Sequence, residues 1–248
     1  MARKKKTTVD KTDRYEKDPE LSTVGVPDLN VAVEKNKDKV LAIVAMGGTN
    51  AYYVHQTMMG KKPHDEVWMC NVMASIIHPN HYDMIWVMDN ILEESHRWSE
   101  FAMKAMIDSG KPIMTSISHP DWKGKETLYP LAKVLKFIGN GYRPNTNTAY
   151  AFTYALMLGY KNIVLYGTDF AVPETLLQKF PPQFLELVEK VGMEYSVEGA
   201  KCMTFWVAHA SAHGVKVYLP PNSSLIPSQS YRPDRPFYGY PKDYVLKE

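Results

Sequence analysis

The chain has 248 residues, 45% of them hydrophobic, and a formal net charge of +2, so it can bury one sizeable core and fits a single α/β domain. Its two cysteines, Cys70 and Cys202, have neither CxxC nor metal-ligand spacing, which excludes a disulfide-rich secreted fold and predicts a reducing, cytoplasmic setting. The chain lacks both a signal-peptide pattern and an apolar run near the ~20 residues that cross a bilayer, so we expect a soluble protein without a membrane partner.

Charge is concentrated at the N-terminus. The first seventeen positions hold seven basic and three acidic residues, while the remainder is close to neutral. We interpret residues 1–36 as a basic, flexible arm. A contact between this arm and a polyanion such as DNA is the alternative to a merely solvated tail.

Strand-like and helix-like segments alternate along the rest of the chain. Short apolar runs predict strands at 40–45, 67–70, 84–88, 112–117, 162–166 and 215–219. Helices are predicted at 51–59, 93–109, 130–137, 149–158, 184–191 and 200–213. This alternation predicts a Rossmann-like, doubly wound and mainly parallel sheet in a single domain, residues 37–226. The aromatic and proline-rich tail, residues 227–248, is expected to pack on that domain.

The most informative stretch is 141–170, which reads GYRPNTNTAYAFTYALMLGYKNIVLYGTDF. Thr146 or Asn147 can cap a helix that is apolar on every face, so this helix should be buried against the sheet and under another element. Gly159 can end the helix in a left-handed turn. The following strand, 162–166, ends at a polar Gly-Thr-Asp sequence. The stretch therefore combines a loop, a buried helix and a strand end in one site-building unit.

Ligands of open parallel sheets bind beyond the carboxyl ends of the strands, so the polar strand ends are the candidate site. The turn Gly47, Gly48, Thr49 and Asn50 is the best phosphate candidate, because two glycines allow close approach and a helix start follows. It matches neither GxGxxG nor a P-loop, and an ordinary strand-to-helix turn is the alternative. Asn71 can read a ribose or a base edge, or it can cap a turn.

Acid–base candidates also follow the predicted strands. Asp89 and Asp169 can bind a ribose hydroxyl, hold a metal or act as a general base, or each can cap a loop. His119 lies on a strand-end loop, and histidine is the side chain most often suited to proton transfer near neutral pH. Glu198 can be a base, or it can favour a helix start through the dipole. With no Asp-x-Asp pair in the sequence, a divalent metal is not indicated.

These motifs together resemble known families. The Gly-Gly-Thr-Asn strand end, the strand ending at Asn71, the Pro144-x-Thr146-x-Thr148 helix start and LGYKNIVLYGTDF resemble bacterial lipo-oligosaccharide sialyltransferases and the MptE-like family, which includes 6-hydroxymethylpterin diphosphokinases. The stretch GVKVYLPPNSSLI followed by FYGY is similar to small Rossmann-like phage proteins described as putative glycosyltransferases. The similarity spans most of 39–240, and its most specific part is 141–170.

The sialyltransferase resemblance implies roles for particular residues. It implies that the turn from Gly47 to Asn50 meets the donor phosphates, that Asn71 meets the donor nucleoside, and that the loop of Thr146, Asn147 and Thr148 closes over the nucleotide. The family's catalytic histidine has no counterpart here, because no histidine lies between Asp169 and His209. The base is therefore open among Asp169, Glu198 and His119.

The leading hypothesis is a glycosyltransferase that uses a UDP-, GDP- or CMP-sugar. If the phage resemblance holds, the protein acts in the host cytoplasm and one acceptor class is a hydroxymethylated base in DNA, which would be DNA modification. The second hypothesis is pyrophosphate transfer from ATP to a pterin alcohol, which needs Mg²⁺ and convergence of Asp89 with Asp169. The third is a non-catalytic nucleotide- or nucleic-acid-binding module. The oligomeric state is left open.

Overall fold

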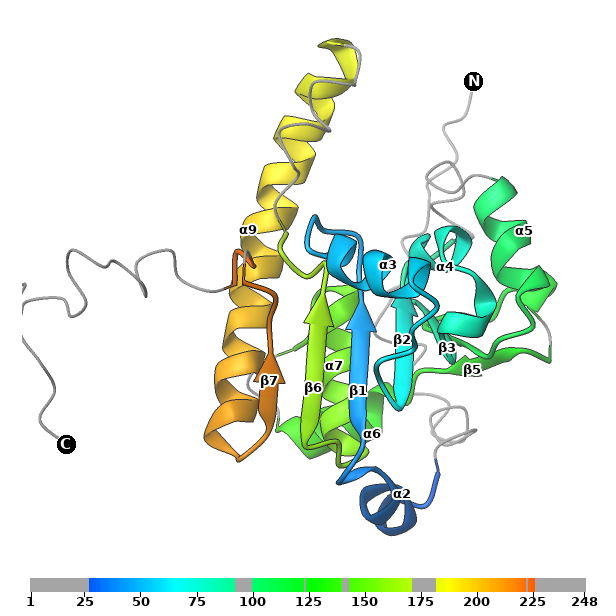
Figure 1. Cartoon of the computed structure of the whole chain (residues 1–248). Coiled ribbons are helices and arrows are strands. Elements are labelled where there is room, and N and C mark those ends of the chain that lie inside the picture. Colours follow the sequence, from blue (N-terminus) through cyan, green and yellow to red (C-terminus); the bar gives the residue numbers. More distant parts are fainter. Residues whose placement is uncertain are drawn as a thin grey trace, which may run out of the picture.

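The chain folds around one seven-stranded sheet in which every strand runs parallel to its neighbours, as shown by a computed structural model (Figure 1). The structure describes residues 27–91, 100–122, 124–139, 143–170, 182–221 and 223–225, without the side chains of 182–196. The strand order is β5-β4-β3-β2-β1-β6-β7. The strands are β1 (Val40–Val44), β2 (Glu66–Cys70), β3 (Met84–Val87), β4 (Ile113–Thr115), β5 (Glu126–Leu128), β6 (Asn162–Tyr166) and β7 (Lys216–Tyr218).

Apolar side chains on both faces explain why the central strands are continuous hydrophobic runs. In β1, Leu41 and Ile43 belong to one buried cluster, and Ala42 and Val44 belong to the other. Successive side chains of a strand point to opposite faces, so a strand covered on both sides needs an apolar residue at every position. The sheet is therefore the middle layer of three.

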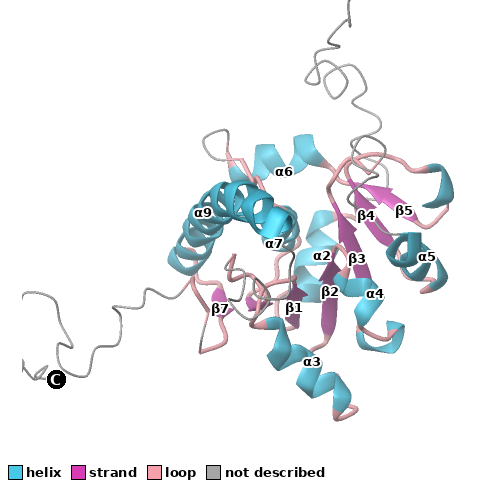
Figure 2. Cartoon of the chain, turned by 90° about the horizontal axis from the view of Figure 1, so that it is seen from above, coloured by secondary structure: helices cyan, strands magenta, loops and turns pink. Residues whose placement is uncertain are grey.

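Helices cover both faces (Figure 2). The helices are α2 (Leu29–Asn36), α3 (Asn50–Met58), α4 (Met73–Ile76), α5 (Glu100–Asp108), α6 (Leu131–Ile138), α7 (Asn147–Met157) and α9 (Pro182–Ala212). Helices α3, α4 and α5 contribute buried residues to one core cluster, and α6, α7 and α9 contribute to the other. This confirms the predicted Rossmann-like, doubly wound fold. Across the part of the chain that is described, no helix is both long and apolar enough to span a membrane.

Helix α7 occupies the position that its composition predicts. Eight of its eleven residues are buried, and it packs on β1, β2 and β3 on one side and against α6 and α9 on the other. Thr146 is the cap, because its side chain accepts from the Ala149 amide, 3.1 Å away. Gly159 follows the helix with φ +84°, as expected for a left-handed end. The apolar circumference of α7 thus reflects burial on two sides.

Strand β5, helix α9 and helix α2 differ from the sequence prediction. Strand β5 was missed because all three of its residues are only half-buried at the sheet edge. The two helices predicted at 184–191 and 200–213 are the single helix α9. Gly199 lies inside this helix, and a β-carbon there would lie 2.5 Å from the ring of Phe170, so the glycine lets Phe170 pack close to the helix backbone. Residues 29–36 of the predicted arm form α2, in which Asn36 donates to the Leu158 carbonyl.

The strand order changes direction between β1 and β6. Successive strands run outward from β1 to β5, and β6 then returns to pair with the other side of β1. The loops that leave β1 and β6 touch there, because the Gly47 amide donates to the Gly167 carbonyl at 2.7 Å. This reversal is the place where open α/β sheets bind ligands.

Replacing Gly167 should destabilise this junction strongly. Gly167 has φ +65°, and a β-carbon would lie 2.1 Å from the backbone oxygen of Ala45. We expect Gly167→Ala to lower the free energy of unfolding by about 3 kcal/mol, from backbone strain plus a clash with immobile backbone. The change is measured as the shift in urea midpoint.

Gly60→Ala is the matched control, since Gly60 has a similar φ of +70° but open space around it. It should cost only about 1 kcal/mol, which is the left-handed penalty alone. Equal losses for the two variants would contradict the close contact between the loops.

Candidate functional site

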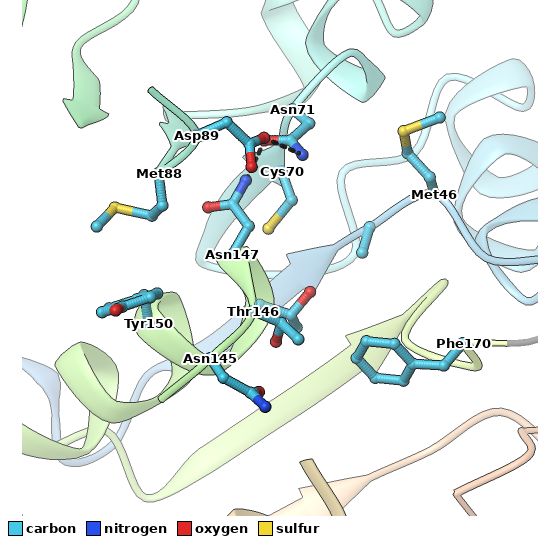
Figure 3. Close-up of a pocket in the computed structure, with 12 residues that line it drawn as sticks. Met46, Cys70, Asn71, Met88, Asp89, Asn145, Thr146, Asn147, Tyr150 and Phe170 are labelled. Atoms are coloured by element: carbon cyan, nitrogen blue, oxygen red, sulfur yellow. Dashed lines mark hydrogen bonds between the residues drawn. The ribbon is translucent and has the colours of Figure 1, made fainter. Parts of the chain in front are cut away.

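A pocket of about 450 Å³ lies at the carboxyl ends of the strands, beside the reversal in strand order (Figure 3). Its lining comes from the ends of β1, β2 and β3, the start of α7 and the loop after β6. The lining residues are Ala45, Met46, Cys70, Asn71, Met88, Asp89, Asn145, Thr146, Asn147, Thr148, Tyr150 and Phe170. Five of the predicted binding residues are among them: Asn71, Asp89, Thr146, Asn147 and Thr148.

Three polar side chains form a connected floor. Asn71 Nδ2 donates to Asp89 Oδ2 at 3.1 Å, and Asn147 Nδ2 donates to Asn71 Oδ1. Asn147 Nδ2 also donates to the Trp86 carbonyl at 2.8 Å, and the backbone amide of Asn71 donates to that same carbonyl. The ends of β2 and β3 and the start of α7 are thereby joined at one point (Figure 3).

Asn71 has a left-handed backbone with φ +54°. Asparagine tolerates this region better than most residues, although it is uncommon outside glycine. This left-handed residue ends the alternation of side chains along β2. It directs the side-chain amide of Asn71 toward Asp89 and Asn147. Non-glycine residues in this conformation cluster at functional sites, which fits the position of Asn71 on the pocket floor.

The start of α7 supplies the only other concentration of polar groups described in the pocket. The Thr146 hydroxyl accepts from the third backbone amide of the helix, that of Ala149. The backbone amides of Asn147 and Thr148 lie in the first turn, so they have no acceptor within the helix. The positive end of the helix dipole points the same way. This end of the pocket therefore favours an anionic group.

Apolar side chains form two opposite walls. Tyr150 and Met88 lie on one side of the polar floor, and Phe170 and Met46 lie on the other (Figure 3). None of these four residues was predicted from the sequence to belong to a site. Tyr150 was detectable in principle, because it lies four residues after Thr146 and so shares its helix face. Phe170 follows the last polar residue of a strand end, which is a weaker signal.

The turn from Gly47 to Asn50, which the sequence predicts as the site of the donor phosphates, lies outside the pocket lining. None of its four residues lines the pocket. The Gly47 amide is bonded to Gly167, and the Thr49 amide donates to Asp169 Oδ2 at 2.6 Å. The start of α3 therefore already carries the carboxylate of Asp169, in the position where the sequence predicts a donor phosphate. A phosphate there would face both occupied amides and a like charge.

Asp169 is a bridge between the β1 and β6 loops. It is 5% exposed, its Oδ1 accepts from the Thr49 hydroxyl at 2.5 Å, and that hydroxyl oxygen in turn accepts from the Gly167 amide at 2.9 Å. Both carboxylate oxygens are thus engaged with Thr49. The geometry gives Asp169 a structural role and does not present it to the pocket as a base.

Glu198 and His119 also lie outside the pocket lining. The Glu198 side chain is 65% exposed on α9 and pairs with Lys201 at 3.0 Å. The His119 amide donates to Glu126 Oε2 at 3.0 Å, and Glu126 begins β5 at the opposite edge of the sheet. The His119 ring packs on Trp122, with 5.1 Å between centroids. The three residues predicted as alternative bases are therefore not brought together.

A divalent metal has no evident ligand set in the part of the chain that is described: no group of three or more His, Cys, Asp or Glu residues converges there. Asp89 lines the pocket while Asp169 faces Thr49, so the two carboxylates that a magnesium site would need do not form one. The predicted N-terminal arm up to residue 26 and the predicted tail, 227–248, lie outside the described residues, and the contacts predicted for them stay predictions.

No family model and no curated protein matches the chain. Among solved structures, the sialyltransferase CstII from Campylobacter jejuni matches in two complexes. The complex with the substrate analogue CMP-3FNeuAc shows 19% identity, 75% coverage of this chain, 82% of that chain and a TM-score of 0.42. The complex with cytidine-5'-monophosphate shows 18% identity, the same coverage of both chains and a TM-score of 0.41.

Another match is the Xanthomonas albilineans dihydropteroate synthase in complex with indole-2-carboxylic acid and 6-chloroguanine. It shows 13% identity, covers 76% of this chain and 88% of that chain, and has a TM-score of 0.21. All three are distant similarities and say nothing of what this chain binds. The chain is defined by its own structure as a Rossmann-like α/β protein with a polar pocket at the carboxyl ends of β1, β2 and β3.

The bridge between Thr49 and Asp169 should be energetically coupled. We expect Asp169→Asn to lower the free energy of unfolding by about 2 kcal/mol, because a buried carboxylate loses charge-assisted bonds. In a double-mutant cycle with Thr49→Val, the coupling energy should be about 1–3 kcal/mol in urea unfolding. Asp108→Asn, which alters an exposed pair with Lys104, is the control and should change stability by less than about 0.5 kcal/mol. A coupling energy near zero would contradict the bridge.

The Cys70 thiol should resist alkylation in the folded protein. Burial on the pocket floor raises the pKa of Cys70 to about 12, so the reactive thiolate is scarce at neutral pH. We expect iodoacetamide at pH 8 to modify Cys202, which is half-buried, faster than Cys70, with both reacting rapidly once urea unfolds the chain. Peptide mass spectrometry measures the two rates. Faster labelling of Cys70 in the native protein would contradict this burial.

Proposed function

We propose that the protein is a glycosyltransferase that moves a sugar from a nucleotide-sugar donor to an acceptor hydroxyl. The observation that carries the proposal is the composition of the pocket. A floor of two side-chain amides and a carboxylate lies between the start of α7 and two apolar walls, at the ligand-binding edge of an open parallel sheet.

The start of α7 is the best place for the donor phosphate. The amides of Asn147 and Thr148 lack acceptors within the helix, and the dipole adds positive potential. In glycosyl transfer the leaving group is this phosphate, so amides aimed at it stabilise the charge that develops as the bond to the sugar breaks. This differs from the sequence expectation, which placed the phosphate at the start of α3.

The floor suits hydroxyl groups of a sugar or ribose. Amide and carboxylate oxygens accept from hydroxyls, so Asn147 can accept from a donor hydroxyl and Asp89 can accept from the acceptor hydroxyl. Asn147 Oδ1 is buried and has no hydrogen-bond partner within the described residues. A buried acceptor without a partner is costly, and a donor hydroxyl of a ligand would satisfy it.

The walls suit the flat parts of such a ligand. Tyr150 and Phe170 can pack on a base or on the apolar face of a sugar ring. The volume of about 450 Å³ falls within the range of small-molecule pockets. The sequence resemblance to sialyltransferases over 141–170 supports the same class of donor, a UDP-, GDP- or CMP-sugar.

Pyrophosphate transfer to a pterin is the less favoured alternative. That reaction was expected to need Asp89 and Asp169 together at a magnesium ion, and Asp169 instead uses both oxygens on Thr49. A non-catalytic binding module would share the pocket but not the turnover, so an activity measurement distinguishes it. The hydroxymethylated DNA base remains the acceptor that the phage resemblance suggests, and it is one arm of the test.

The test incubates the full chain with UDP-, GDP- and CMP-sugars and with ATP, with and without Mg²⁺, and follows release of the free nucleotide. We expect slow release from one nucleotide class, as water replaces the acceptor. Release should accelerate when the correct acceptor alcohol is added, and duplex DNA containing hydroxymethylated bases is included as one acceptor.

Gly199→Ala is an informative variant for this assay. Alanine favours a helix, so α9 should keep its stability, yet the new methyl group would push the Phe170 ring that forms one wall. We expect at least a ~5-fold higher KM for the donor with the urea midpoint retained.

AMP release from ATP with a pterin acceptor, or no turnover with any donor, would overturn the proposed function.

A further inference from the structure

We propose that Asp89 is the general base of the transfer, and that Asn71 positions its carboxylate. This assignment rests on the proposed function. It prefers Asp89, for which the sequence left donor binding and base catalysis both open, over Asp169, Glu198 and His119.

Position in the pocket selects Asp89. A general base must come within hydrogen-bond reach of the proton that it removes. Asp169 is buried against Thr49, Glu198 pairs with Lys201 on the outside of α9, and His119 lies near the start of β5. Of these four candidates, Asp89 alone lines the pocket.

Chemistry selects Asp89 among the described lining residues as well. The titratable side chains of that lining are Cys70, Asp89 and Tyr150. Burial raises the pKa of the Cys70 thiol to about 12, with a smaller contribution from the negative charge of Asp89, so this thiol stays protonated. A phenol is protonated at neutral pH, whereas a carboxylate is ionised and can accept a proton directly.

The hydrogen-bond chain on the floor sets the orientation of the carboxylate. Asn71 Oδ1 accepts from Asn147, so the Asn71 amide must present its Nδ2 to Asp89 Oδ2. Asn147 is in turn held by the Trp86 carbonyl, which belongs to β3. One end of the chain is therefore anchored to the sheet, and the other end fixes the rotation of the Asp89 carboxylate.

The left-handed backbone at Asn71 serves this arrangement. An extended residue following Cys70 would project to the other face of the sheet, away from α7. With φ +54°, the side chain of Asn71 lies beside both Asp89 and Asn147. The strained turn is thus explained by the position that it gives to the amide.

The acceptor hydroxyl oxygen forms a bond to the anomeric carbon of the donor sugar while its proton passes to the Asp89 carboxylate. The bond between the anomeric carbon and the phosphate oxygen breaks, and its electron pair leaves with the nucleotide phosphate. The amides at the start of α7 receive that negative charge. The protonated Asp89 then returns its proton to solvent.

Asp89→Asn tests the assignment with little change of shape, because the asparagine oxygen can still accept from Asn71. With the donor that the unaltered chain turns over, we expect kcat to fall about 10²–10⁴-fold, the usual contribution of a general base. The donor Kd, measured by calorimetry, should stay within about threefold. Glu198→Gln is the matched control, because Glu198 was an alternative base but lies exposed on α9 outside the pocket lining, and the change should leave kcat unchanged.

Sodium azide provides a second readout. Azide is an anionic nucleophile with no proton to remove, so it should raise the turnover of Asp89→Asn at least ~10-fold and have little effect on the unaltered chain. A structural or donor-binding defect would not be rescued in this way.

The positioning role of Asn71 is tested with Asn71→Gly, because glycine tolerates the left-handed backbone and removes only the amide. We expect kcat to fall at least ~10-fold. The double variant with Asp89→Asn should be no slower than Asp89→Asn alone, since Asn71 acts through Asp89.

The outcomes separate this inference from the proposed function. If no donor is turned over by the unaltered chain, both are overturned. If the unaltered chain turns over a donor and Asp89→Asn keeps the same kcat, the function stands and the base assignment is overturned. A raised donor Kd with unchanged kcat would make Asp89 a binding residue, which also overturns the assignment, as would losses that multiply in the double variant.

Discussion

The bridge between Thr49 and Asp169 is the constraint on which the geometry of the carboxyl edge depends. It ties the loop after β1 to the loop after β6 across the reversal in strand order. The two glycines at the junction make this possible, since a β-carbon at Gly47 or Gly167 would strike the opposite loop. By placing a carboxylate at the start of α3, the bridge also removes that helix as an anion site and leaves the start of α7 as the one that faces the pocket.

Helix α7 links stability to the site. Its body is buried between the sheet and α9, so its position is set by packing along its length. Its first turn is therefore held rigidly where Asn147 meets Asn71 and the end of β3. Sites built on such supported elements keep their geometry, whereas the polar floor alone would be free to rearrange. At position 199 of α9 a glycine lets the helix pass close to Phe170, because a β-carbon there would displace the Phe170 ring.

Much of the fold could be predicted from the sequence, because burial on two faces leaves a continuous apolar signature. The central strands and α7 were identified from that signature, and Thr146 and Gly159 were correct as the ends of α7. Two elements with weaker patterns were predicted wrongly. Strand β5 was missed because it is a half-buried edge strand, and α9 was predicted as two helices because a glycine inside it indicates a break. Of the candidate site, the polar residues at strand ends were found, but the apolar walls were not, since an aromatic residue beside a pocket has the same sequence pattern as one in the core.

By itself, the amino-acid sequence determined the layer architecture and the set of polar residues at the carboxyl edge, because local periodicity and helix capping depend on residues that are close together in the sequence. Only the tertiary structure decided how those residues are partnered. Asp89 and Asp169 follow their strands in the same way in the sequence, yet one lines the pocket beside Asn71 and the other bonds to Thr49, 120 positions away. The physical reason is that the position of a carboxylate depends on which hydrogen-bond donors lie within about 3 Å, and those donors come from distant parts of the chain.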